Sequence, residues 1–501
     1  MTDSVTTHHL PLTSGDTICA PATATGGALA VIRVSGPAAF SIVSTLCPLS
    51  CAAAAANTVH FTRLMAPVPD ASPSGEIIDE ALVTVFRAPH SYTGEDSVEI
   101  SCHGSTYIVR RILDLLIQNG CRMARPGEFT QRAYLNGKLD LSQAEAVADL
   151  IASTNRATHD IAMSQLRGHF SSELKTLRDQ LLKLTSLLEL ELDFSDHEDL
   201  EFADRSELLA LAQKIEARIT YLAQTFETGQ ALKQGIPVAI VGKTNVGKST
   251  LLNQLVDDER AIVSDIHGTT RDTIEETMEI NGIQFRFIDT AGLRETTDEI
   301  ERIGIQRTYA AIDKARIVLW LFDASPTAAD ISDMTARCSG RALIPILNKT
   351  DLHPVCCDKI TTHPIIPISA KHGQGISALK SAIYQAADIP TLSSNDVIVT
   401  SARHYDALIR AHHNLQHVLD GLSINLSGDL LSEDLRLVLA DLAEITGEGQ
   451  ITPQETLNNI FSHFCVGKSN TINGYHSILL DMTKSFISKH FHTRNIISVN
   501  R

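Results

Sequence analysis

Midway along the chain stands the stretch Gly242-Lys243-Thr244-Asn245-Val246-Gly247-Lys248-Ser249. It follows a short apolar run, residues 236–241, and precedes the helix-like segment 250–253. A glycine-rich turn between a strand and a helix presents main-chain N–H groups to a polyphosphate, and the positive end of the helix adds to the attraction. We expect Lys248 to reach the β- and γ-phosphates and the Ser249 hydroxyl to bind Mg²⁺. The motif therefore predicts a nucleoside triphosphate site in an α/β domain.

Three later segments predict that the base is guanine. Asp289-Thr290-Ala291-Gly292 follows a strand-like run, where an aspartate can hold Mg²⁺ through water and a glycine N–H can bind the γ-phosphate. In Asn348-Lys349-Thr350-Asp351 the carboxylate can accept two N–H bonds from the Watson–Crick edge of guanine. Ser369-Ala370-Lys371 follows a further apolar run and predicts a main-chain cradle for the base. This combination resembles the translation-factor-like branch of P-loop GTPases, which implies GTP rather than ATP.

Hydrolysis needs a device other than the glutamine of Ras-type enzymes, because Leu293 stands at that position and cannot bind water. The side-chain oxygen of Asn245 can hold a monovalent cation beside the phosphates. Alternatively, an acid among Asp298, Glu299 and Glu301 can orient the water. Acids are equally expected at the start of the helix predicted from residue 300, so the residues alone leave both readings open.

Composition limits the class of protein. A chain of 501 residues predicts two to four domains. No apolar run of about 18 residues is present, so we expect no membrane span. Nine cysteines without metal-ligand spacing, and a beginning without a basic and apolar leader, predict a cytoplasmic protein with reduced thiols. The net charge of −17 means that RNA binding needs a local basic patch or a basic partner.

The pattern of apolar residues predicts several domains. Residues up to about 137 indicate a mixed α/β domain, with strands near 28–34 and 79–86 and a helix over 107–118. Leucines and alanines at helical spacing, such as Leu174, Leu177 and Leu181, then predict a bundle from 138 to 234, and helical spacing resumes after 402. The P-loop segment, 235–388, lies between these halves, as expected for a domain inserted in a helical bundle.

Several longer blocks carry a resemblance to one family, the MnmE (TrmE) family of bacterial tRNA-modification GTPases. Examples are Arg125-Pro126-Gly127-Glu128-Phe129 and Phe464-Cys465-Val466-Gly467-Lys468. The other blocks are residues 32–36, 91–96 with Glu99, 133–141, 143–146 and 265–272. The resemblance covers the chain up to Lys468, and the final segment, 469–501, departs from it.

The resemblance implies an N-terminal domain, 1–137, that binds 5-formyl- or 5,10-methylene-tetrahydrofolate and forms a homodimer. It implies a helical domain made of 138–234 and 389–468, an inserted GTPase domain at 235–388 and an atypical tail at 469–501. The positions that correspond to folate contacts are Arg33, Glu99, Lys138 and Lys468. Without the family, ordinary surface ion pairs would be the favoured interpretation of the first three.

The resemblance also assigns roles in the GTPase domain. It implies a K⁺ site made by Asn245, Ser264, Ile266 and Thr269, and Mg²⁺ ligands at Ser249 and Thr270. Glu301 corresponds to the acid that orients the hydrolytic water. The residues expected at the GTP site are Asn245, Val246, Gly247, Lys248, Ser249, Thr250, Ser264, Asp265, Ile266, His267, Gly268, Thr269, Thr270, Asp289, Thr290, Ala291, Gly292, Asn348, Lys349, Asp351, Ser369, Ala370 and Lys371.

The activity implied by the family needs a partner, the flavoprotein MnmG, which brings FAD and NADH. Together they add an aminomethyl or carboxymethylaminomethyl group to carbon 5 of the wobble uridine of certain tRNAs, with folate supplying the carbon. Cys465 is a candidate catalytic residue, with a packed small thiol as the alternative. Two other functions stay open at this point: a potassium-dependent ribosome-assembly GTPase switch and a folate-binding regulatory protein.

Overall fold

The computed structural model describes residues 15–24, 26–66, 76–193, 205–260, 276–288, 309–352, 359–360, 363–389 and 396–447, together with 457, 460, 461 and 464. The chain divides into two compact units, Met1–Leu139 with Pro453–Arg501 and Asp140–Thr452. In the described residues no helix is long and apolar enough to cross a bilayer. The expectation of a multidomain α/β protein is confirmed.

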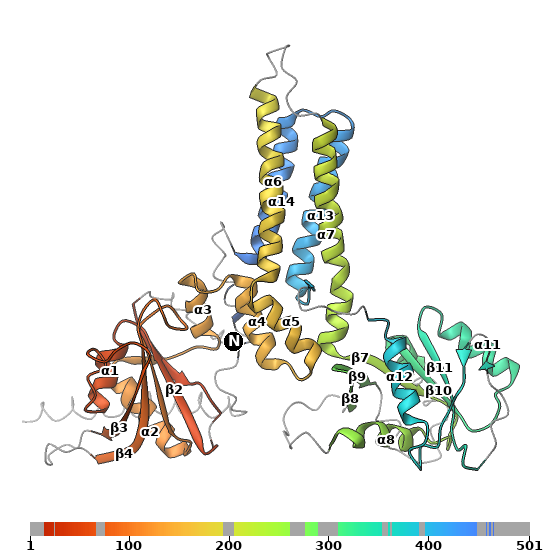
Figure 1. Cartoon of the computed structure of the whole chain (residues 1–501), viewed down its shortest axis with the longest axis horizontal. Helices are drawn as coiled ribbons and strands as arrows, with labels where there is room; N and C mark the ends of the chain where they lie inside the picture. The colour runs from red at the N-terminus through yellow and green to blue at the C-terminus, as the bar shows by residue number, and fades with distance from the viewer. Residues whose placement is uncertain are drawn as a thin grey trace, which may run out of the picture. The chain divides into compact units, whose positions relative to one another are not determined.

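The first unit is built on a six-stranded sheet in the order β3-β4-β5-β2-β1-β6. The strands are β1 (Thr17–Pro21), β2 (Leu29–Ser35), β3 (Thr58–Ala66), β4 (Glu76–Phe86), β5 (Ser97–His103) and β6 (Cys121–Met123). All neighbours are antiparallel except β1 and β6. Helices α1 (Ala39–Leu46) and α2 (Thr106–Gln118) pack against one face, and α3 (Glu128–Leu135) follows β6 (Figure 1).

Alternation along these strands separates a buried face from an open one. On β5, Val98 and Ile100 are fully buried in the core under the helices. Their neighbours Glu99 and Ser101 point to the other face and are half-buried. Phe61 on β3 belongs to this second face and is 68% exposed. The N-terminal sheet therefore presents one open face in the single chain.

Four long helices of the second unit, α6 (His169–Asp193), α7 (Arg205–Gln234), α13 (Ala402–Ser423) and α14 (Gly428–Thr446), share one core (Figure 1). The predicted stripe is buried there, with Leu181, Leu184 and Leu188 fully inaccessible. Two short helices, α4 (Leu141–Ala152) and α5 (Arg156–Leu166), precede α6. Segments on both sides of the P-loop region thus contribute to a single apolar core.

The return of the chain to this core depends on Gly229 in α7. A β-carbon at Gly229 would collide with the carbonyl oxygen of Val399, so only glycine lets the segment 396–400 lie against the helix. Side chains then fix that segment: Gln165 donates to the Ile398 carbonyl at 3.1 Å and Gln230 to the Thr400 carbonyl at 3.0 Å.

The P-loop region forms a second six-stranded sheet in the order β14-β11-β10-β7-β9-β8, parallel except for β8. Its strands are β7 (Ile236–Val241), β8 (Glu276–Ile280), β9 (Ile283–Phe287), β10 (Ile317–Phe322), β11 (Ala342–Leu347) and β14 (Ile366–Pro367). The bounded helices in the described part of this region include α8 (Lys248–Arg260), α11 (Ala328–Arg337) and α12 (Ile376–Ala386), and β12 (Lys359–Ile360) pairs with β13 (His363–Pro364). The carboxyl ends of β7, β10 and β11 meet at one edge, where ligands bind in such sheets.

The described residues near the C-terminal end of the chain pack on the first unit. Gly127, which precedes α3 with a φ of +67°, lies against Phe461 and Phe464. A β-carbon on Gly127 would approach the Phe461 carbonyl oxygen to 2.7 Å. An aromatic segment with no helical period gives no local sign of this distant partner in the sequence. The predicted domain bounds stay predictions.

Candidate functional site

The turn after β7 has the backbone that a phosphate loop needs. Asn245 and Gly247 have φ values of +62° and +99°, in the left-handed region that turns main-chain N–H groups toward one side. A β-carbon on Gly247 would collide with the side-chain nitrogen of Asn348, so glycine is required there. The turn then enters α8 at Lys248, as the motif predicts.

Lys248 folds back over this turn. Its Nζ donates to the carbonyl oxygens of Gly242 and Lys243, both at 2.8 Å. Burial lowers the pKa of Lys248, because the surrounding protein solvates the ammonium less well than water does. The cation is therefore held within the loop, and phosphate oxygens would give it better partners than neutral carbonyls.

Asn348, at the end of β11, joins the phosphate loop to the predicted base cradle. The side chain is almost completely buried. Its Nδ2 donates to the Val246 carbonyl at 2.8 Å, and its Oδ1 accepts from the Ala370 N–H at 3.0 Å. One amide thus satisfies two main-chain groups from segments more than a hundred residues apart.

Lys349 makes a second link to the phosphate loop. Its Nζ donates to the Asn245 carbonyl and to Asp323 Oδ2, both at 2.8 Å. Asp323, which follows β10, was not among the residues expected from the sequence. Its position could have indicated a role, because a carboxylate directly after a buried parallel strand lies at the same sheet edge as the residues that follow the neighbouring strands.

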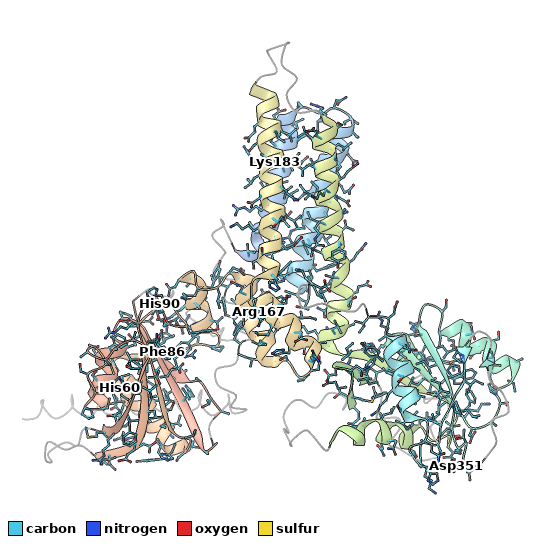
Figure 2. The ribbon with its side chains drawn as sticks, in the orientation of Figure 1. His60, Phe86, His90, Arg167, Lys183 and Asp351 are labelled. Atoms are coloured by element: carbon cyan, nitrogen blue, oxygen red, sulfur yellow. The ribbon has the colours of Figure 1, made fainter. Side chains whose placement is uncertain are left out.

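Asp351 is the last residue of the Asn348–Asp351 motif and follows β11 (Figure 2). The Ser369 hydroxyl donates to Asp351 Oδ1 at 2.7 Å, and this hydrogen bond lowers the pKa of the carboxyl. His372 Nε2 lies 3.7 Å from the other oxygen. Ser369 is itself fully buried and bonded through its main chain to Gln374, so the carboxylate is held by a rigid turn. Lys371, the last residue of the predicted cradle, is exposed beside it.

Of the predicted GTP-site residues, the structure therefore describes Asn245 to Thr250, Asn348, Lys349, Asp351 and Ser369 to Lys371, and brings the loop and cradle together. The predicted residues that lie outside the described part of the chain are Ser264, Asp265, Ile266, His267, Gly268, Thr269, Thr270, Asp289, Thr290, Ala291, Gly292, Glu301, Cys465 and Lys468. Leu293, Asp298 and Glu299 are outside it too.

A second candidate site lies on the open face of the N-terminal sheet. Arg33 on β2 is directly opposite Glu99 on β5, and its Nε and NH2 donate to Glu99 Oε1 at 2.9 and 2.7 Å. The guanidinium carbon also lies 5.0 Å from the Tyr92 ring centroid and 5.5 Å from that of Phe129. Charged groups beside two aromatic rings can bind a planar ligand both by electrostatic contacts and by stacking.

Lys138 is fixed to the loop that carries Tyr92. Its Nζ donates to the Pro89 carbonyl at 3.0 Å, and the neighbouring Asn136 donates to the Thr93 carbonyl at 2.7 Å. The Tyr92 hydroxyl lies 2.8 Å from the Thr130 hydroxyl on α3. The sequence reasoning gave no role to Tyr92 or Phe129, although both stand in the motif blocks.

Buried charges hold α3 beside this site. Arg132, almost fully buried, pairs with Asp16 at 2.6 Å and with Glu95 at 3.1 Å. Glu128, fully buried, accepts from Arg122 at 2.5 Å. Burial alone would raise the pKa of Glu128, but the hydrogen bond from Arg122 lowers it overall. These ion pairs fix the helix that presents Phe129, because an unpaired buried charge is costly.

The described ranges contain no group of three or more histidine, cysteine, aspartate or glutamate side chains that could hold a metal ion. The metal sites expected at the phosphates would instead use hydroxyl and amide oxygens with the nucleotide. Ser249 and Asn245 are exposed on the phosphate loop and have suitable oxygen atoms.

Comparison with known proteins gives matches over most of the chain. The family model "GTP-binding protein TrmE N-terminus" matches residues 17–138, and the model "MnmE helical domain" matches residues 141–465. The protein named tRNA modification GTPase MnmE from Phocaeicola vulgatus is 50% identical over 497 residues, covering 90% of this chain and 99% of the relative. The protein of the same name from Bacteroides thetaiotaomicron is 52% identical over 469 residues, with the same two shares covered.

Solved structures give more distant similarity. The crystal structure of the G domain of the T. maritima FeoB iron transporter covers 30% of this chain and 99% of its own, with 21% identity and a TM-score of 0.23. Similarity at this level bears on neither substrate nor partner.

Proposed function

Because the chain belongs to the MnmE family of tRNA modification GTPases, we propose that it couples GTP hydrolysis to the addition of an aminomethyl or carboxymethylaminomethyl group at carbon 5 of the wobble uridine. Binding and hydrolysis of GTP belong to the family. The one-carbon donor, the position on tRNA and the partner are our proposal. The partner would be the flavoprotein MnmG, carrying FAD and NADH.

At the GTP site we propose that Ser249 and Thr270 hold Mg²⁺ and that Asn245, Ser264, Ile266 and Thr269 hold K⁺. The exposed Asn245 side chain, on a loop already turned toward the phosphates, supports this assignment. A cation there would supply positive charge where the transition state accumulates negative charge. Glu301 would orient the water, because Leu293 cannot.

The Arg33–Glu99 pair is the observation that carries the folate part of the proposal. A tetrahydrofolate offers a flat pterin edge with N–H donors for a carboxylate and glutamate carboxylates for cations. Glu99 would accept from the pterin, Tyr92 or Phe129 would stack on it, and Arg33 or Lys138 would bind the negative tail. Bound there, the folate would supply the transferred carbon.

Packing of the C-terminal residues supports a role for Cys465 and Lys468 at the same site. Phe464 lies against Gly127, and two residues later Phe129 lies against Arg33. Cys465 follows Phe464 directly in the sequence. Phe464 itself lies beside the residue that precedes α3, the helix that carries Phe129 next to Arg33.

A homodimer is the third part of the proposal, and the open sheet face supports it. Val59, Phe61 and Leu82 are 58%, 68% and 46% exposed on this face, where Phe61 on β3 is directly opposite Leu82 on β4. Thr84, in the next row, is opposite Glu99. An apolar patch on a single chain is a frequent site of association, and a second copy covering it would border the folate site.

The test uses matched ion pairs on this one face. Arg33→Lys and Glu99→Gln should each reduce binding of 5-formyl-tetrahydrofolate at least tenfold, because the loss of a charge-assisted bond costs about 1.5–3 kcal/mol. Arg63→Lys and Glu80→Gln alter a cross-strand pair at 3.1 Å that is not flanked by Tyr92 or Phe129, and should leave binding unchanged. Equilibrium dialysis of the purified chain measures the affinity.

Mass spectrometry of tRNA nucleosides provides the second measurement. A strain lacking the gene should accumulate unmodified wobble uridine, and the Glu99→Gln chain should not restore the modification. Normal modification with no measurable folate binding would overturn the folate part of the proposal and leave the tRNA role in place.

A further inference from the structure

At the end of β5 in the N-terminal sheet, His103 and Asp79 form a pair that neither the GTP site nor the Arg33–Glu99 pair uses. His103 ends β5, and its Nδ1 lies 2.8 Å from Asp79 Oδ1 on β4. The two side chains differ sharply in exposure, 67% for His103 and 7% for Asp79. A buried carboxylate therefore orients an imidazole whose other nitrogen, Nε2, faces solvent.

The backbone at this point is built around the carboxylate. Asp79 also accepts from the main-chain N–H of His103 at 2.8 Å and of Glu80 at 2.9 Å. The register of β4 shifts beside it, since Leu64 pairs with Asp79 but Met65 pairs with Ile77. Such bulges redirect a side chain and are frequent next to active sites. Next to this bulge, Asp79 is opposite the buried Leu64, and its carboxylate reaches the main-chain N–H at the end of β5.

The residue after His103 is equally constrained. Gly104 donates to the Ala28 carbonyl at 3.1 Å and accepts from Gly26 at 3.0 Å. A β-carbon on Gly104 would collide with the Gly27 carbonyl. The imidazole is therefore fixed by the bond to Asp79 on one side and by a locked main chain on the other, as a group used in chemistry must be.

Stability does not explain this arrangement. Because His103 is two-thirds exposed, its ring buries little apolar area. Asp79 already has two main-chain donors, so the imidazole is not needed to satisfy the carboxylate. A carboxylate on Nδ1 instead selects the tautomer with the proton on Nδ1, which leaves Nε2 able to accept a proton.

We propose that Asp79 and His103 are an acid–base pair, in which His103 Nε2 takes the proton from an ammonium ion or a protonated primary amine bound on the open sheet face. The proton moves from nitrogen to Nε2, and the electron pair of the broken N–H bond stays on nitrogen as the free amine. This inference rests on the proposed function, in which the nitrogen of the aminomethyl group enters as an amine. A protonated amine has no electron pair for bond formation, so a base is required.

The position on the sheet agrees with this role. Glu99 and His103 are four residues apart on β5 and share its outer face, so they are separated by about 13 Å. Ser101 lies between them, opposite Val31 on β2. An elongated ligand held at Arg33 and Glu99 can therefore extend along β5 toward the imidazole.

The experiment measures the pH dependence of tRNA modification by the full-length chain, added to an extract of a strain that lacks the gene. Besides Asp79, the charged groups facing this end of the sheet are Glu80 and its partner Arg63, and β2 contributes Leu29. In the wild type the rate should rise with pH, because only an unprotonated Nε2 can accept a proton. His103→Gln should lower the rate at least tenfold and remove this rise, since a general base typically contributes 10²-fold or more.

His60→Gln is the matched control (Figure 2). His60 is on β3 of the same sheet, and its Nε2 lies 2.7 Å from the Thr58 hydroxyl rather than a carboxylate. We expect the wild-type rate and profile for this variant. A wild-type rate and pH profile for His103→Gln would overturn the proposal.

Imidazole ¹⁵N spectra give a readout that does not depend on activity. The signal lost in His103→Gln identifies the residue, which should carry its proton on Nδ1 in the wild type. Asp79→Asn should weaken that preference. A proton on Nε2 in the wild type would overturn the proposal. Absence of folate binding to the wild-type chain would instead contradict the proposed function, and the comparison of His103→Gln with wild type would still decide the role of the pair.

Discussion

The side-chain amide of Asn348 donates a 2.8 Å hydrogen bond to the main-chain carbonyl of Val246 and so connects the base side of the GTP site to its phosphate side. The same side chain accepts from the Ala370 N–H. One buried side chain therefore joins the cradle to the loop that holds Lys248. This relation makes Asn348 a structural element of the site as well as part of a recognition motif.

Replacing Asn348 by Ala should weaken GTP binding about 10- to 100-fold. The change leaves two buried main-chain groups without partners, and each costs about 1–3 kcal/mol. Part of this cost should appear as a lower Tm of the GTPase domain. Titration with a fluorescent GTP analogue measures the affinity. Asn414→Ala, which removes a 2.8 Å bond to Asp441 in the helical core region, is the control and should bind GTP normally.

Asp351→Asn should change which base is bound. The wild-type carboxylate accepts two N–H bonds from guanine, whereas an amide donates on one side and therefore suits xanthine, which has a carbonyl in place of the amino group. We expect at least a tenfold loss for GTP and a gain for xanthosine triphosphate, from competition binding. Asp333→Asn, at an exposed pair with Arg337, should change neither. An Asp351→Asn chain that still prefers GTP would show that another group reads the base.

The P-loop and the Asn348–Asp351 segment could be predicted because each is a contiguous run whose chemistry depends on neighbouring residues. The same holds for the leucine stripe of α6, whose spacing specifies its buried face. Other contacts depend on register between distant strands. The Arg33–Glu99 pair joins residues 66 positions apart, and its roles came from a family resemblance rather than from the residues.

The contacts that could not be predicted from the sequence have one physical cause in common. The rings around Arg33, the Lys349–Asp323 pair and the Asp79–His103 pair all form between strands or loops brought together only by the fold. Local propensity carries no information on such partners. The contact between Phe461 and Gly127 is another example, because the local sequence around neither residue predicts it.

Glu301→Ala should reduce GTP turnover by about 10²-fold while GTP affinity stays nearly the same. The reason is Leu293, which cannot position water, so an acid must do so. Glu299→Ala, two residues away, is the control and should hydrolyse GTP at the wild-type rate. Steady-state phosphate release measures both. A loss of less than about tenfold would mean that Glu301 is only a charge at a helix start.

GTP hydrolysis should be faster in KCl than in NaCl at equal ionic strength, and Asn245→Gly should abolish the difference. Glycine keeps the φ of +62° without strain and removes only the side-chain oxygen. A cation at that oxygen would stabilise charge on the phosphates in the transition state, and the size of its cavity would select K⁺. Equal wild-type rates in KCl and NaCl would contradict the assignment of a K⁺ site at Asn245.

Glu145 links stability to pH in the helical core. It pairs with Arg403 and His404, both at 2.8 Å. Burial alone would raise the pKa of Glu145, but the charges of His404 and Arg403 bring it down to about 2, against an ordinary value of 4.5. Because the folded-state pKa is the lower one, the pair stabilises the fold above about pH 4.5 and loses its effect as the pH falls toward 2. A lowering of this size corresponds to roughly 3 kcal/mol of stability at neutral pH.

Glu145→Gln should therefore lower the Tm of the full chain strongly at pH 7 and progressively less as the pH is reduced from 5 to 3. The difference in Tm between wild type and variant becomes smaller because protonation removes the ion pair of the wild type, while the variant has no such pair. Glu433→Gln, at an exposed pair with Arg436, should give a small gap that does not change with pH. Calorimetry at three pH values measures each gap. A Glu145→Gln gap that stayed constant across this range would show that packing of the side chain, rather than its charge, stabilises the junction of α4 and α13.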